Sequence, residues 1–95
     1  MVVGVCRFVI SMPGNRSLKE KRARMRPLIQ ALQKNYKVSV AEVDLQNTAD
    51  AGAIAFALVG NDRRTVNSVI DKIVERIEEL ADVVLQEHDF EITNY

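Results

Sequence analysis

Six basic residues lie within eleven positions near the start of the chain, and they carry the clearest chemical signal in the sequence. They are Arg16, Lys19, Lys21, Arg22, Arg24 and Arg26. On a helix that turns about 100° per residue, Lys19, Arg22 and Arg26 fall on one solvent-facing stripe. Arg16 and Ser17 stand where that helix begins, and the free amide groups at a helix N-terminus favour an anion.

A stripe of ammonium and guanidinium groups can bind successive phosphates of a nucleic-acid backbone without reading its bases. We therefore expect Arg16, Ser17, Lys19, Arg22 and Arg26 to bind structured RNA, with no recognition of a DNA sequence. A related alternative is a small anion or metabolite held at the helix N-terminus, near Gly14, Arg16 and Ser17.

The distribution of charge leaves a different interpretation open. Residues 1–37 hold nine of the thirteen basic residues and one acid, whereas residues 38–95 hold twelve of the thirteen acids. The net charge of zero, which by itself argues against a nucleic-acid partner, therefore conceals a polarised molecule. The basic side chains can equally be solvated, or they can pair with acids within the fold or across a dimer.

The residues that most often perform catalysis or bind metals are sparse. Cys6 is the single cysteine and His88 the single histidine, so a Cys/His metal cluster is impossible. Cys6 lies among apolar residues, where a thiol is usually inert. Glu42 and Asp44 alternate onto one face of a predicted strand, but no neighbour separates their pKa values for acid–base work. Residues 13–16 lack the glycine- and valine-rich arginine loop of small phosphatases. We expect no enzymatic activity, no metal and no cofactor.

The elements that position these side chains follow from hydrophobic periodicity and from turn residues. Strands are predicted over residues 2–12, 37–45, 52–60 and 83–92, and helices over residues 17–35 and after Asn61-Asp62. The order β-α-β-β-α-β over residues 1–95 predicts a single ferredoxin-like α+β domain. Right-handed crossovers then place both helices on one face of a four-stranded antiparallel sheet.

Two features of the first helix are predicted from local chemistry. Ser17 and Glu20 form a capping box, in which the serine oxygen accepts a hydrogen bond from the amide of residue 20. Pro27 lies inside the helix, opposite its apolar stripe. Because proline removes one backbone hydrogen bond and clashes with the preceding turn, we expect a kink.

The sheet face that the helices leave uncovered is unexpectedly apolar. Its two central strands present Val3, Val5, Val9, Ala53, Ala55 and Ala57. Such a patch usually marks an interface, so we expect a homodimer or another protein–protein contact, unless local register or a loop covers the patch. Phe8 and Phe56 fall on the opposite, core side, which argues against base stacking as in RNA-recognition motifs.

The run Ser17-Leu-Lys-Glu-Lys-Arg22, preceded by Pro13-Gly14-Asn15-Arg16, resembles the signature of the YlxP-like family. Residues 38–43 and 58–62 resemble its second and third blocks. The family consists of bacterial proteins grouped as a domain of unknown function. The resemblance implies a ferredoxin-like fold, no established catalysis, and a gene neighbourhood shared with translation initiation and small-subunit maturation factors. The chain departs from the family pattern at Pro27 and in lacking tryptophan at residues 46–50.

The chain start lacks the pattern of a secretory signal, and no stretch is apolar for long enough to span a membrane. Together these observations predict a cytoplasmic, non-catalytic protein that associates with RNA or the ribosome through its first helix. The alternative function is a homodimeric interaction module that uses the apolar sheet face.

Overall fold

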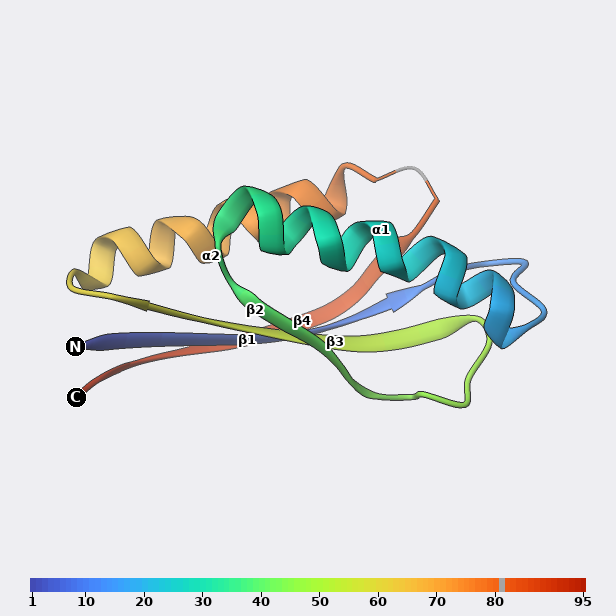
Figure 1. The fold of residues 1–95 in the computed structure, drawn as a ribbon, viewed down its shortest axis with the longest axis horizontal. Helices are drawn as coiled ribbons and strands as arrows, with labels where there is room; N and C mark the ends of the chain where they lie inside the picture. The colour runs from blue at the N-terminus through green and yellow to red at the C-terminus, as the bar shows by residue number, and fades with distance from the viewer. Residues whose placement is uncertain (81) are drawn as a thin grey trace.

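A computed structural model describes residues 1–80 and 82–95 of the chain. Its elements are β1 (Val2–Ser11), α1 (Leu18–Tyr36), β2 (Ser39–Asp44), β3 (Ala51–Gly60), α2 (Arg63–Glu78) and β4 (Val84–Asn94). The strands form one antiparallel sheet in the order β2-β3-β1-β4. Both helices lie on the same side of this sheet (Figure 1). The predicted ferredoxin-like fold is therefore confirmed.

The core lies between the helices and the two central strands. β1 pairs with β3 along its whole length, so that Cys6 lies opposite Phe56 and Phe8 opposite Ile54. All four side chains are buried, and the rings of Phe8 and Phe56 are 6.4 Å apart at their centroids. Alternating residues of both strands thus share one buried face, as the strand period of two requires.

The ends of α1 are fixed by local hydrogen bonds. Ser17 is the N-cap, and its Oγ accepts from the amide of Glu20 at 3.1 Å. Glu20 reaches back as well, since its Oε2 accepts from the amide of Arg16 at 3.0 Å. Lys37 closes the helix with a left-handed backbone (φ 54°), so the strand predicted from residue 37 begins only at Ser39. The helix runs on through the exposed Pro27.

A β-bulge in β2 corrects the prediction that Glu42 and Asp44 share a face. Glu42 pairs with Ile54, whereas Asp44, two residues later, pairs with Ala53, which is directly before Ile54 in β3. The extra residue, Val43, shifts the alternation by one position. Glu42, paired with the buried Ile54, faces α1, whereas the bulge turns Asp44 to the side without helices.

Candidate nucleic-acid interface

The predicted basic stripe forms one exposed surface of α1. Lys19, Arg22 and Arg26 are exposed and line a shallow hollow of about 340 Å³, together with Gln30 and Pro27. The three cationic residues occupy successive turns of one helix face, because they are spaced three and four residues apart. The structure thus places these three sequence-predicted residues together.

Lys21 behaves differently from its neighbours, although the sequence gives it the same basic character. Its side chain is only 3% exposed, and its Nζ lies 2.8 Å from Oε2 of Glu42. The same ammonium group donates a hydrogen bond to the carbonyl oxygen of Leu45 at 2.7 Å. This cation is used to hold α1 to β2 and to the start of the following connection, so it does not contribute to the exposed surface.

Space for Lys21 comes from a glycine on β3. A Cβ atom at Gly52 would lie 2.9 Å from Sδ of Met25 and 3.4 Å from Cε of Lys21. Both side chains of α1 therefore pass over a strand position that carries no side chain. A glycine within a strand often marks such a close approach, and that was the one sequence signal for this contact.

Among the remaining basic residues of the cluster, one forms a hydrogen bond within the fold and the others are exposed to solvent. Arg24 donates a hydrogen bond to the carbonyl oxygen of Asp82 at 3.1 Å. In residues 1–80 and 82–95, the ion pairs are Lys21–Glu42 and Arg7–Asp44. Within this part of the chain, Lys19, Arg22 and Arg26 therefore have no carboxylate partner.

The N-terminus of α1 is already occupied by groups of the chain itself. Ser17 uses its Oγ to cap the amide of Glu20, and the Glu20 carboxylate accepts from the amide of Arg16. An incoming anion would meet this carboxylate at the position where the helix dipole favours negative charge. The side chain of Arg16 is exposed beside it. The geometry thus favours the exposed side of α1 at Lys19, Arg22 and Arg26 over its N-terminal amide groups as the place where a phosphate could bind.

A larger groove of about 560 Å³ runs along the other side of the basic stripe, between α1 and β2 with its following connection. Arg22, Arg26 and Gln30 form the ridge between this groove and the shallow hollow, since all three line both. Gln46 and Asn47 contribute the far wall. The sequence analysis missed the groove, because these two residues meet α1 only through the packing of β2.

On the sheet face without helices, the apolar surface has the expected position but a smaller extent. Val5 is 44% exposed and Val59 is 67% exposed. Ala57, opposite Val5, and Ala55, opposite Arg7, are partly exposed. Val3 and Val9 are also partly buried. Ala53 is fully buried and unavailable, contrary to its expected place in a contact surface.

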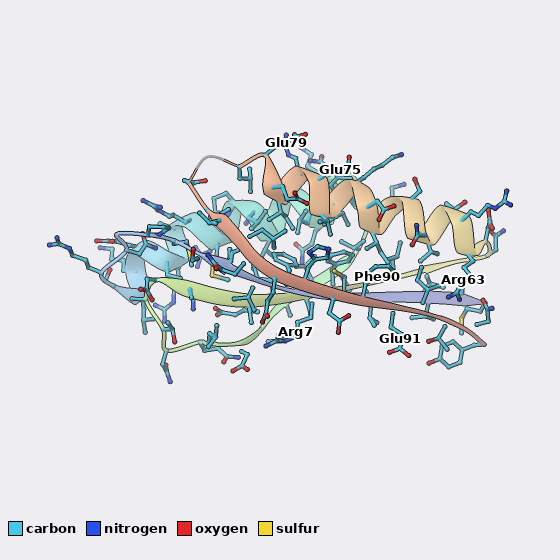
Figure 2. The ribbon with its side chains drawn as sticks, turned by 180° about the vertical axis from the view of Figure 1, so that it is seen from behind. Arg7, Arg63, Glu75, Glu79, Phe90 and Glu91 are labelled. Carbon is cyan, nitrogen blue, oxygen red and sulfur yellow. The ribbon has the colours of Figure 1, made fainter. Side chains whose placement is uncertain are left out.

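Charged residues border this apolar surface. Arg7 lies opposite Asp89 on β4, and Val5 lies opposite Glu91. Figure 2 shows Arg7 and Glu91 on the side of the sheet away from α2. Arg7 also pairs with Asp44 on β2, with 3.6 Å between Nη2 and Oδ2. The exposed valines are therefore bordered by one basic residue, Arg7 on β1, and by acidic residues on β4.

A family model described as "Protein of unknown function (DUF503)" matches residues 3–90. The chain belongs to the DUF503 family. No curated protein matches it. The match confirms that the chain contains a domain of unknown function, whereas the more specific resemblance to the YlxP-like family stays a prediction.

In this DUF503 chain, the thiol of Cys6 is buried within β1. Burial, with a smaller contribution from the charge of Asp89, raises the pKa of the Cys6 thiol from 9.0 to about 11. The thiol is therefore protonated at neutral pH and is a poor nucleophile. His88 is exposed on β4. Among the described residues, no group of three or more His, Cys, Asp or Glu could hold a metal ion.

Neither α1 nor α2 is long and apolar enough to cross a membrane.

Proposed function

We propose that this DUF503 member is a non-catalytic, cytoplasmic protein that binds structured RNA through α1, in ribosome assembly or translation. One observation carries the proposal: Lys19, Arg22 and Arg26 share an exposed surface and have no carboxylate partner in the described chain. Binding of phosphates by such side chains releases condensed counterions, which favours association. Arg16, the exposed residue before the N-cap Ser17, adds a fourth cation near the start of the helix.

The ribosomal context has a separate source of support. The run from Ser17 to Arg22 resembles the YlxP-like signature, whose genes neighbour those of translation and small-subunit maturation factors. Because Lys19 and Arg22 belong to both the signature and the exposed surface, the resemblance and the geometry point to the same residues.

The test is the salt dependence of binding to a double-stranded RNA. The variant Lys19→Ala/Arg22→Ala/Arg26→Ala removes three cations, so the slope of log K against log salt should become shallower by up to about three units. The control is Arg64→Ala/Lys72→Ala/Arg76→Ala, which removes the same charge from exposed positions of α2. An equal change of slope in both variants would show that only net charge matters.

Association with the ribosome requires its own measurement. The wild-type chain and the α2 control should co-sediment with ribosomal subunits or their precursors, and the α1 triple variant should not. Unchanged co-sedimentation of the α1 variant would contradict the proposal.

A homodimer formed through the open sheet face is a second candidate. Val5 and Val59 are exposed, and the neighbouring Ala55 and Ala57 are small, so the surface favours close packing. A two-fold contact is self-complementary, so Arg7 of each copy can meet the acidic β4 of the other. A shallow hollow of about 370 Å³, lined in part by Arg7, Asp89 and Glu91, lies at this position.

Mass measurement at high micromolar concentration tests the homodimer. Ala55→Arg places a charge within the apolar surface and should convert the dimer to a monomer. Ser68→Arg, at an exposed position of α2, is the matched control and should leave the mass unchanged. A monomeric wild-type chain would eliminate self-association.

A further inference from the structure

We infer that the groove between α1 and β2 binds one unpaired nucleotide of the RNA that α1 contacts, with adenine the preferred base. The inference rests on the proposed function and assigns a role to the larger of the two hollows that Arg22 and Arg26 line. At about 560 Å³, the groove lies within the range of roughly 300 to 1,000 Å³ that is usual for small-molecule sites.

The groove is positively charged along one edge. Arg22 and Arg26 line it, and they also line the shallow hollow with Lys19. The two charged residues inside the groove, Lys21 and Glu42, neutralise one another. A phosphate on the ridge of Arg22 and Arg26 would thus lie between the duplex-binding surface and the groove, and the nucleotide it carries could turn inward.

The floor and walls of the groove suit a base. Leu18, Met25 and Ile29 provide apolar surface. The polar groups are mostly carboxamides, from Gln30, Gln33, Gln46 and Asn47. A carboxamide presents a donor beside an acceptor, which is the pairing that adenine offers in return. Unpaired bases in loops and bulges are the usual targets of such contacts in RNA.

The far wall is held in place by Lys21. Its ammonium group binds Glu42 on β2 and the carbonyl oxygen of Leu45, directly before Gln46 and Asn47. The two carboxamides on this wall thus follow a backbone position fixed to α1. Because an ordered wall loses less conformational entropy on binding, these contacts favour a preformed site.

The experiment compares two RNA probes by titration: a short duplex, and the same duplex with a single bulged adenine. The wild-type chain should bind the bulged duplex roughly tenfold more tightly, the size of one good carboxamide–base pair. The variant Gln46→Ala/Asn47→Ala changes no cation, so it should bind the plain duplex normally and lose the preference for the bulge. Asn61→Ala, an exposed carboxamide at the end of β3, is the control and should keep the preference.

The outcomes separate this inference from the proposed function. Equal affinity of the wild-type chain for both probes, or a preference that survives Gln46→Ala/Asn47→Ala, overturns the nucleotide site and leaves duplex binding by α1 intact. Failure of the wild-type chain to bind either probe at low salt overturns the proposed function, and the nucleotide site with it.

Discussion

Lys21 of α1 and Glu42 of β2 form an ion pair with 2.8 Å between Nζ and Oε2. The lysine side chain is almost fully buried, whereas the glutamate remains 27% exposed. Oε2 of Glu42 is itself buried and accepts no hydrogen bond in the described structure, so Lys21 satisfies it by charge alone. This pair connects the basic N-terminal part of the chain to its acidic remainder. It also gives Lys21 a structural role that the neighbouring exposed cations do not have.

Loss of the Lys21 ammonium should destabilise the fold. Lys21→Met keeps the apolar stem but leaves Glu42 and the Leu45 carbonyl without their partner, so we expect a loss of about 2 to 4 kcal/mol. The double variant Lys21→Met/Glu42→Gln should lose less unfolding free energy than the sum of the two single variants, because Lys21 and Glu42 interact. Denaturant unfolding measures all three variants. Lys19→Met, at an exposed position, should cost less than about 0.5 kcal/mol; an equal loss there would contradict a special role for Lys21.

Gly52 should tolerate no side chain without rearrangement of α1. In Gly52→Ala the new methyl group would lie 2.9 Å from the Met25 sulfur, and we expect destabilisation of about 1 to 3 kcal/mol. Met25→Ala removes the obstructing atoms at the cost of a cavity. The double variant Gly52→Ala/Met25→Ala should therefore lose less unfolding free energy than the sum of the two single variants, as measured by denaturant unfolding. Simple additivity would show that Met25 does not limit the space.

Ser17 should contribute to stability as a cap. Its Oγ accepts from the Glu20 amide, so Ser17→Ala should cost about 1 kcal/mol. Ser17→Asp keeps an acceptor at the same position and should restore most of that loss. The midpoint of denaturant unfolding is the measurement. Equal destabilisation by alanine and aspartate would show that the cap contributes little.

Cys6 should make stability fall at high pH. In the unfolded chain the thiol ionises near 9.0, whereas burial raises the pKa of the folded thiol to about 11. The folded state therefore holds the proton more tightly. Its stabilising contribution is fully present below pH 9 and is lost as pH rises toward 11, by at most about 3 kcal/mol.

Unfolding of the wild-type chain and Cys6→Ala, each measured at about pH 8 and about pH 10.5, tests this linkage. The wild-type chain should lose more stability between the two values, because only it carries the thiol. Identical losses in the two proteins would assign the pH dependence to other groups.

The sequence alone determined the features that depend on local periodicity. Strand alternation assigned Phe8 and Phe56 to the core, and helical spacing placed Lys19, Arg22 and Arg26 on one stripe. The Ser17 cap was also predicted, because its partner is three residues away. These features require no knowledge of which elements pack together.

The tertiary structure decided the features that depend on register at the edge of the sheet. The pairing of Glu42 with Ile54 placed its carboxylate on the helix side of the sheet, and one extra residue, Val43, turned Asp44 to the other side, which no alternation pattern reveals. The packing of α1 on β2 gave Lys21 a buried partner in Glu42 and separated it from the other cations. The same packing brought Gln46 and Asn47 to the wall of a groove on α1. The physical reason is that periodicity fixes which way a side chain points from its own element, whereas only strand pairing and helix packing fix what it meets there.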